Sequence, residues 1–374
     1  MLAAVTTVSI LCFLIGAGES RHITYPTAEA GDELVSVVVM YRHGDRSPIA
    51  SFQNDPYYDS SYWPEGYGQL LSKGVLRHYN LGKWLRNRYG SFLPAEYSPK
   101  HIQVYSTDVD RTLMSAQANL AGLYTPVDSH IWEEGFLWEP VPIHRLALDD
   151  PVLAMNSACP KQGVLEGEVK QSDFYQTLSK DNSDLFKTLS EYTGMSVGMG
   201  TISIVYDVIY VYRNHNESFV PSWVEDVDME QVNYLASMAF AKSIYTDELK
   251  RLKTGPFYNY LINYFSDVIS GDSDVAKFLM LSAHDSTISY VLGGMGAFDF
   301  QPPEFASSVI WELRKNTDGH YINVLYKRNS TDTYDDIKVY ECSLDCAFDD
   351  FKLNMAGVSV DPETWHEECQ INSY

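Results

Sequence analysis

The chain has 374 residues, of which 45% are hydrophobic and 21% charged, so it can bury a large core and is not a disordered chain. Its formal net charge of -23 at pH 7 argues against binding to nucleic acid or to an anionic membrane, because little basic surface remains to neutralise phosphates. A few clustered arginines in so acidic a chain would still attract a small anion.

Residues 2–18 are apolar and uncharged and end in small residues. This segment is short for a membrane span, so residues 1–18 are predicted to be a secretory signal peptide. The alternative is an uncleaved anchor, because no Lys or Arg precedes the apolar run. The later sequence has no apolar stretch long enough to cross a bilayer, and the mature chain is therefore predicted to have no membrane span.

Residues 34–40 are mostly apolar and rich in valine, a pattern typical of a buried strand. The strand leads directly into the sequence YRHGDRSP at residues 41–48. Here Gly44 would allow a tight bend and Pro48 would prevent a return to regular structure. The segment is therefore predicted to be a loop at the end of a strand.

This loop carries an arginine on each side of a histidine. The guanidinium groups of Arg42 and Arg46 match a tetrahedral oxyanion, and an imidazole between them can attack phosphorus. His43 is therefore the candidate nucleophile, and the two arginines are candidate phosphate ligands. The alternative is a surface turn in which all three side chains are solvated.

The next elements are predicted to be a helix at residues 72–89, a strand at 101–106 and a helix at 111–123. Arg111 then lies in the first turn of the second helix, where backbone N–H groups and the helix dipole favour an anion. The alternative for Arg111 is a solvated helix arginine. His78 falls on the apolar face of the first helix and is interpreted as a core or rim histidine.

From about residue 146 to 256 strand patterns fade and polar helical segments replace them. Examples are residues 185–192 and 229–253, the second of which is predicted to end at Gly255 and Pro256. This region is interpreted as a helical insertion.

After the insertion we expect a helix at 257–269, a strand at 277–281, a hairpin of strands 307–313 and 321–327, and a short strand at 337–342. The strand at 277–281 leads into His284 and Asp285, so a third strand ends in polar residues. Ligands of open α/β sheets bind beyond the carboxyl ends of the strands. The three charged segments are therefore predicted to form one pocket.

The sequence R-H-G-x-R-x-P at residues 42–48 resembles the signature of the histidine phosphatase superfamily. The sequences STDVDRTLMSA at 106–116 and SAHDST at 282–287 resemble the other two active-site segments of this family, in the order and spacing of its acid phosphatase branch. The resemblance covers roughly residues 33 to 370 and is nearest to the prostatic and lysosomal members.

The resemblance implies an α/β fold like that of phosphoglycerate mutase, with a mainly parallel sheet and helices on both faces. Residues 33–145 and 257–370 would form the catalytic domain, and residues 146–256 a smaller, mainly helical cap. Related enzymes are often homodimers, although the sequence itself does not indicate an oligomeric state.

The resemblance also assigns roles to the candidate residues. Arg42, Arg46 and Arg111 would bind the phosphoryl group, and His43 would become phosphorylated. His284 would donate a hydrogen bond to a phosphate oxygen, and Asp285 would protonate the leaving alkoxide. No metal or other cofactor is expected, because three arginines supply the positive charge that the reaction needs.

Cys12 would be lost with the signal peptide, which leaves four cysteines in a chain predicted to enter an oxidising compartment. Two disulfides are expected, and four cysteines allow three pairings. The resemblance implies Cys342 with Cys346 and Cys159 with Cys369. The sequons at Asn216 and Asn329 fit a glycosylated protein that is secreted or lies in the lysosomal lumen.

The predicted function is thus an acid phosphatase that hydrolyses phosphate monoesters of small molecules or phosphoproteins through a phosphohistidine. A phosphomutase would share the histidine and arginines but is ordinarily cytosolic. A phytase is a closer alternative, although the acidic composition disfavours a hexaphosphate. A secreted glycoprotein that binds phosphorylated ligands without turnover is the non-enzymatic alternative.

Overall fold

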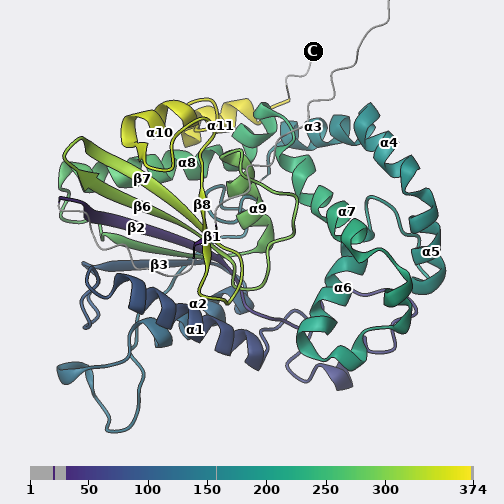
Figure 1. Ribbon diagram of the computed structural model, residues 1–374, viewed down its shortest axis with the longest axis horizontal. Coiled ribbons are helices and arrows are strands. Elements are labelled where there is room, and N and C mark those ends of the chain that lie inside the picture. The colour runs from purple at the N-terminus through teal and green to yellow at the C-terminus, as the bar shows by residue number, and fades with distance from the viewer. Residues whose placement is uncertain (1–19, 22–30, 157, 372–374) are drawn as a thin grey trace, which may run out of the picture.

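A central mixed sheet organises the protein, which is described here from a computed structural model (Figure 1). The structure describes residues 20–21, 31–156 and 158–371, and the predicted signal peptide lies outside them. The strands run in the order β1-β8-β7-β6-β2-β5-β3-β4, and β9 pairs with β7. The bounds are β1 Ser20–Arg21, β2 Glu33–Arg42, β3 Ile102–Thr107, β4 His144–Leu146, β5 Phe278–Ala283, β6 Ser308–Asn316, β7 Gly319–Lys327, β8 Tyr334–Ile337 and β9 Cys346–Ala347.

The two halves of the sheet differ in strand direction. Strands β2, β5, β3 and β4 are parallel, whereas β6, β7, β8, β1 and β9 pair antiparallel. The parallel half places the carboxyl ends of β2, β3 and β5 at one edge of the sheet. The expected α/β class is confirmed, and the predicted hairpin is the β6–β7 pair.

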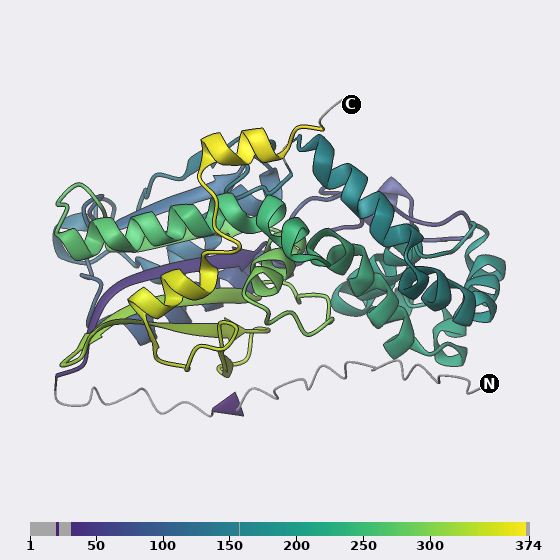
Figure 2. The ribbon, with the colours of Figure 1, turned by 90° about the horizontal axis from the view of Figure 1, so that it is seen from above.

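Helices cover both faces of the sheet, as expected for strands that are apolar throughout. Helices α1 (Ser72–Tyr89) and α2 (Asp110–Leu123) pack on one face, and α8 (Asp247–Ser270), α9 (Asp285–Gly294) and α10 (Phe348–Met355) on the other (Figures 1 and 2). Side chains of β2 alternate between the two cores: Val37 and Val39 face α1, and Val38 and Met40 face α8.

Five helices form a separate group beside the sheet (Figure 2). They pack around three small apolar cores, two of which also include side chains from the rest of the chain. Helix α6 lies nearest to the loop after β2, because its Val208, Val211 and Tyr212 pack against Phe52 and Leu71. The five helices are α3 Pro160–Gln171, α4 Asp173–Asp181, α5 Ser183–Thr193, α6 Ile202–His215 and α7 Met229–Ala241.

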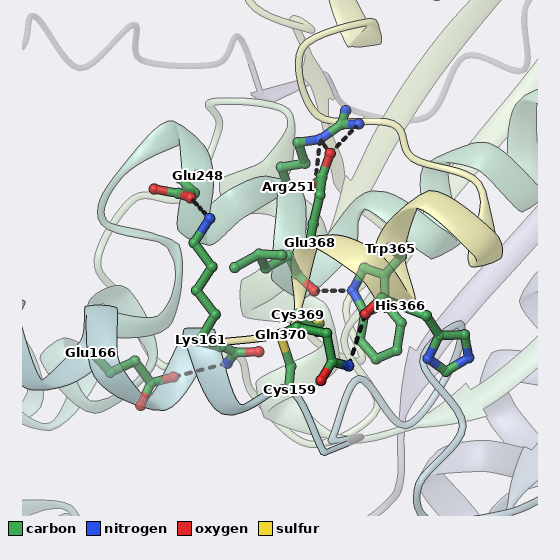
Figure 3. Close-up of a disulfide and its surroundings, with 12 residues drawn as sticks. Cys159, Lys161, Glu166, Glu248, Arg251, Trp365, His366, Glu368, Cys369 and Gln370 are labelled. Carbon is green, nitrogen blue, oxygen red and sulfur yellow. Dashed lines mark hydrogen bonds and ion pairs between the residues drawn. A yellow bond between two sulfur atoms is a disulfide. The ribbon is translucent and has the colours of Figure 1, made fainter. Parts of the chain in front are cut away.

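The predicted helix end at Gly255 and Pro256 is wrong, because α8 continues through both residues. Proline removes a helical hydrogen bond and leaves the carbonyl group four residues earlier without its partner. In this protein the carbonyl oxygen of Leu252 instead accepts a hydrogen bond from the indole Nε1 of Trp365, at 2.8 Å (Figure 3). The break occurs earlier, where Thr246 caps the start of α8.

Trp365 lies in α11 (Pro362–Glu368), which is tied to the helical group by a disulfide between Cys159 and Cys369. The second disulfide joins Cys342 and Cys346. Both pairings are those that the family resemblance implies. The short strand predicted at 337–342 is displaced: β8 ends at Ile337, and the following residues lead into the tight Cys342–Cys346 loop.

Candidate active site

Backbone hydrogen bonds to neighbouring segments fix the loop after β2 in place. The N–H of His43 donates to the carbonyl of Ala283, and the N–H of Ala306 donates to the carbonyl of His43. A glycine is needed at position 44 because the loop passes very close to α1, and not because of the predicted bend. A Cβ at this position would lie 2.5 Å from the carbonyl oxygen of Gly74. The loop therefore meets β5 on one side and α1 on the other.

The imidazole of His43 is almost completely buried, with 2% of its surface exposed. Its Nδ1 lies 2.9 Å from the carbonyl oxygen of Gly44. Since a carbonyl can only accept, Nδ1 carries the proton and Nε2 keeps a free lone pair. Burial, followed by the charges of Arg42, Arg111 and Arg46, holds the pKa of His43 well below its ordinary value. The ring is therefore neutral and can act as a nucleophile through Nε2.

Arg42 is fixed on three sides. Its Nη1 donates to the carbonyl of Pro303, its Nη2 pairs with Asp285 at 2.8 Å, and its guanidinium carbon lies 4.3 Å from the centre of the Phe305 ring. Phe305 and Pro303 belong to a loop that the sequence patterns did not single out. Cation–π stacking and a backbone acceptor orient the group without neutralising its charge.

Arg46 and Arg111 complete the cationic side of the site. Arg46 pairs with Asp207 of α6, at 3.1 and 2.7 Å, and Arg111 donates from Nη1 to the carbonyl of Gly68 at 3.5 Å. Burial, then the charge of Arg46, lowers the pKa of Arg111 to about 10. Burial is the largest cause of this shift, and the positive charges of Arg46 and Arg42 add to it.

The three arginines share one further property. In each of Arg42, Arg46 and Arg111 the Nε atom is buried and has no hydrogen-bond partner in the structure. Buried N–H groups of charged side chains are costly to leave without an acceptor. Three buried cations this close together favour an anion between them, and a phosphoryl group spreads its charge over three oxygens.

His284 and Asp285 enter the site from the end of β5. Nε2 of His284 lies 3.0 Å from the hydroxyl of Thr107, which is the last residue of β3. If this hydroxyl donates to Nε2, the ring proton lies on Nδ1, where it can be given to another acceptor. Burial, then the charge of Arg111, lowers the pKa of His284 to about 4, so the ring is neutral above that pH.

Asp285 is the first residue of α9, directly after the N-cap residue His284. Its Oδ1 accepts the N–H of Ser286 at 2.8 Å. Burial raises the pKa of Asp285, but the charges of Arg42, Arg46 and His284 outweigh burial and lower the pKa below its ordinary value. The carboxyl group is therefore ionised in the free protein at mildly acidic pH.

The structure thus brings together all six residues predicted for the pocket, from the ends of three neighbouring parallel strands. It also adds residues that the sequence patterns missed: Asp207, Thr107, Phe305 and Tyr210. Only Thr107 lay within a recognised segment. Among the described residues, no group of three or more His, Cys, Asp or Glu side chains could hold a metal ion.

Comparison with known proteins agrees with this geometry. A family model for the histidine phosphatase superfamily (branch 2) matches residues 33–327. The chain is 34% identical to human prostatic acid phosphatase over 349 residues, which are 91% of this chain and 89% of that protein. It is also 34% identical to lysosomal acid phosphatase of Xenopus laevis over 349 residues, 91% of this chain and 80% of that protein.

Among solved structures, Hafnia alvei phytase in complex with tartrate matches 92% of this chain and 100% of its own chain, with a TM-score of 0.69. The sequence identity is 17%, so this likeness shows the fold alone. The extent of the family match and the identity to the two acid phosphatases show that the chain belongs to the histidine phosphatase superfamily (branch 2).

Proposed function

We propose that this protein is an acid phosphatase that hydrolyses phosphate monoesters through a covalent phosphohistidine at His43. The observation that carries the proposal is the convergence of Arg42, Arg46 and Arg111 on His43, whose Nδ1 proton is committed to the Gly44 carbonyl. A phosphoryl group bound among the three guanidinium groups would compensate their positive charge and place phosphorus within reach of Nε2 of His43.

In the first step Nε2 of His43 would form a bond to phosphorus while the bond between phosphorus and the ester oxygen breaks. The leaving alkoxide would take a proton from Asp285. Water would then attack the phosphohistidine, with Asp285 accepting a proton, and release inorganic phosphate. The arginines and His284 would stabilise the charge on the phosphoryl oxygens in both steps.

The lowered pKa of Asp285 raises the question of where the leaving-group proton comes from. Phosphate monoesters have a second pKa near 6, so at mildly acidic pH they arrive as monoanions that carry one proton. Transfer of this proton to Asp285 would be favoured, because the resulting dianion is held by three arginines. Activity should therefore rise as the pH falls below about 6, which is the basis for an acid optimum.

The predicted division into domains remains a proposal. Residues 33–145 and 257–370 would form the catalytic unit, and residues 146–256 the cap that faces the leaving group. Asp207 of α6 supports this division, since the helical group contributes a side chain to the phosphate site. The boundary at residue 256 falls inside α8, so this helix would belong to both units.

A secreted or lumenal location is also proposed. The two disulfides support an oxidising compartment. Asn216 is exposed, and its side chain caps a short turn, so it is accessible for glycosylation; Asn329 is half-buried. No helix of the described residues is long and apolar enough to cross a membrane.

We propose a homodimer formed through the loop at residues 131–138, which projects at the lower left of Figure 1. Five large apolar side chains of this loop are at least 44% exposed. They are Ile131, Trp132, Phe136, Leu137 and Trp138. Contiguous apolar surface of this kind marks interaction sites.

The experiment that tests the function is phosphate release from a panel of esters between pH 4 and 8, with chelator present throughout. The panel should include alkyl and aryl phosphates, a phosphotyrosyl peptide, a bisphosphorylated sugar and inositol hexakisphosphate. Hydrolysis of monoesters with an acid optimum supports the proposal. Preference for the hexakisphosphate would favour a phytase, transfer within the bisphosphate a phosphomutase, and phosphate binding without turnover a non-catalytic protein.

A further inference from the structure

Helix α6 reaches the phosphate site through a single carboxylate. Both oxygens of Asp207 accept hydrogen bonds from Arg46: Oδ2 from Nη1 at 3.1 Å and Oδ1 from Nη2 at 2.7 Å. The Arg46 side chain is 3% exposed and that of Asp207 is 21% exposed. The pair is thus a bidentate contact at the edge of the site, between two segments 161 residues apart.

This contact leaves part of the Arg46 fork available. A guanidinium group has five N–H donors, and Asp207 uses one from each terminal nitrogen. Nη1 also donates to the carbonyl of Ser47, whereas the Nε–H is buried and has no partner. Asp207 therefore occupies the end of the guanidinium group and leaves the second N–H of Nη2 for another acceptor.

The same helix also supports the second arginine of the loop. Tyr210, one turn after Asp207, lies with its ring centre 5.6 Å from the guanidinium carbon of Arg42, and its hydroxyl accepts the N–H of Phe305. The ring of Phe305 lies 4.3 Å from the same guanidinium carbon and 4.9 Å from the Tyr210 ring, so the two rings lie on the same side of Arg42. One face of α6 thus contacts both arginines that flank His43.

We propose that Asp207 is a positioning residue that fixes the plane of the Arg46 guanidinium and thereby its orientation toward the phosphoryl group. The helical group then takes part in catalysis without touching the reacting atoms, because a shift of α6 would turn Arg46. This inference rests on the proposed phosphatase function and deepens it. A carboxylate that served only to anchor α6 would affect stability but would not act through Arg46.

A double-mutant cycle separates these two roles. Asp207→Asn keeps the shape of the side chain but presents one amide N–H₂ to the guanidinium group. We expect it to lower kcat/KM for an aryl phosphate about 10- to 100-fold. Arg46→Gln should lower kcat/KM further, and adding Asp207→Asn to Arg46→Gln should change it less than about twofold, because the residue through which Asp207 acts is already absent.

Two further variants complete the design. Asp207→Glu retains a bidentate carboxylate and should recover part of the activity that Asp207→Asn loses. Glu368→Gln is the matched control, because Glu368 of α11 makes a similar bidentate contact with Arg251 of α8 (Figure 3). It should lower the melting temperature without changing kcat/KM.

The same double-mutant cycle is repeated for phosphate binding: calorimetry measures the affinity of each variant for inorganic phosphate and needs no turnover. If the parent protein binds phosphate but hydrolyses no ester, the proposed function fails while the non-additive effect on phosphate binding still supports positioning. Additive losses from Asp207→Asn and Arg46→Gln, in either assay, would overturn the positioning role. A parent protein that neither binds phosphate nor hydrolyses esters would refute both proposals.

Discussion

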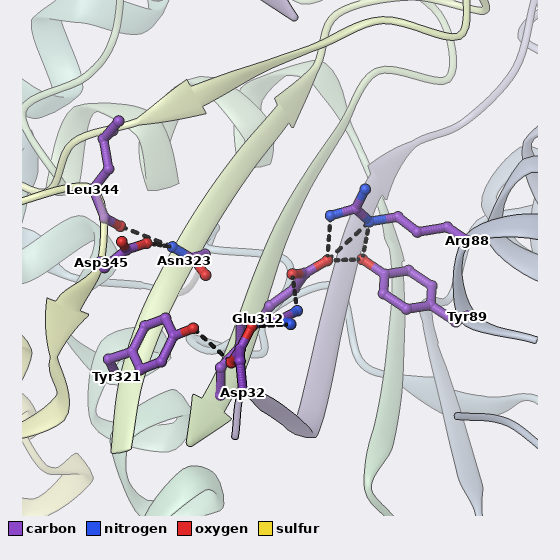
Figure 4. A network of polar contacts seen from close by, with 9 residues as sticks. Asp32, Arg88, Tyr89, Glu312, Tyr321, Asn323, Leu344 and Asp345 are labelled. Atoms are coloured by element: carbon purple, nitrogen blue, oxygen red, sulfur yellow. Dashed lines mark hydrogen bonds and ion pairs between the residues drawn. The ribbon is translucent and has the colours of Figure 1, made fainter. Parts of the chain in front are cut away.

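Two clusters of arginines and carboxylates lie at opposite ends of β2, and they differ in how completely their charges are matched. At the amino end, Glu312 of β6 accepts hydrogen bonds from Arg88, Tyr89 and Arg314, while Arg314 also pairs with Asp32 at 2.6 Å (Figure 4). At the carboxyl end, Arg42 pairs with Asp285 and Arg46 pairs with Asp207. Arg111 has no carboxylate partner among the described residues.

The pKa shifts follow this difference. In the amino-end cluster burial raises the pKa of Glu312, but Arg88, Tyr89 and Arg314 together outweigh burial and lower it. Burial lowers the pKa of Arg88, but its interactions, Tyr89 and Glu312 foremost, outweigh burial and raise it. At the carboxyl end the pKa of Arg111 is lowered to about 10. The first cluster is electrostatically complete and stabilises the fold, whereas the second keeps an excess of positive charge that suits an anion.

The largest expected effect concerns Asp285 and sharpens the comparison at the active-site end. Asp285→Asn should lower kcat for alkyl phosphates about 10²- to 10⁴-fold, because alkoxides need a proton to leave. For an activated aryl phosphate the loss should be much smaller, since His43 and the arginines remain. Steady-state kinetics on both esters test this; an equal loss on both would remove Asp285 from the acid role.

The next effect is on stability and concerns the opposite end of β2. Arg88→Gln leaves the buried carboxylate of Glu312 without its main charge partner and should lower the free energy of unfolding by about 3 to 5 kcal/mol. Urea unfolding at pH 7 measures this loss. Below the unfolding transition kcat/KM should be that of the parent protein, and a large kinetic defect would contradict the assignment of this cluster to stability.

Arg111→Gln should show the reverse pattern. Loss of one phosphate donor should lower kcat/KM about 10²- to 10³-fold. The free energy of unfolding should stay the same or increase, because burial and the charge of Arg46 already disfavour the Arg111 cation. Kinetics and urea unfolding on one preparation give both numbers. Marked destabilisation by Arg111→Gln would mean that the two clusters do not differ as described.

The smallest effect is the pH dependence of stability that comes from His78. This buried ring donates from Nε2 to the carbonyl of Arg42, and burial lowers its pKa to about 3. Since the pKa in the unfolded chain is about 6.5, the contribution of His78 is complete above pH 6.5 and is lost as the pH falls toward 3. At pH 5 the loss is about 2 kcal/mol.

The variant His78→Gln keeps a donor for the Arg42 carbonyl but does not titrate. Between pH 7 and pH 5 it should therefore lose about 2 kcal/mol less stability than the parent protein in urea unfolding. Identical pH dependence of the two proteins would show that His78 is already charged in the folded state.

Much of the fold and site could be predicted because the signals are local. The predicted bounds of α1 agree with the structure at both ends, and the three charged strand ends converge as the rule for parallel strands requires. Asp207 could not be found in this way, since it is one acid on an amphipathic helix and gains its role from a partner distant in sequence. The helix end predicted at Pro256 was wrong for the same reason. The carbonyl group that the proline leaves without a helical partner accepts a hydrogen bond from Trp365, which is more than a hundred residues away.

The central claim is that His43 forms a covalent bond to phosphorus, and rapid quench of the reaction with a ³²P-labelled ester tests it most directly. A phosphoramidate is stable in alkali and labile in acid, so the label should remain on the protein after an alkaline quench and be lost after an acid quench. Peptide mapping should place it on His43, and His43→Ala should abolish both label and turnover. A His43→Ala variant with the activity of the parent protein, or a label that survives acid, would contradict the account.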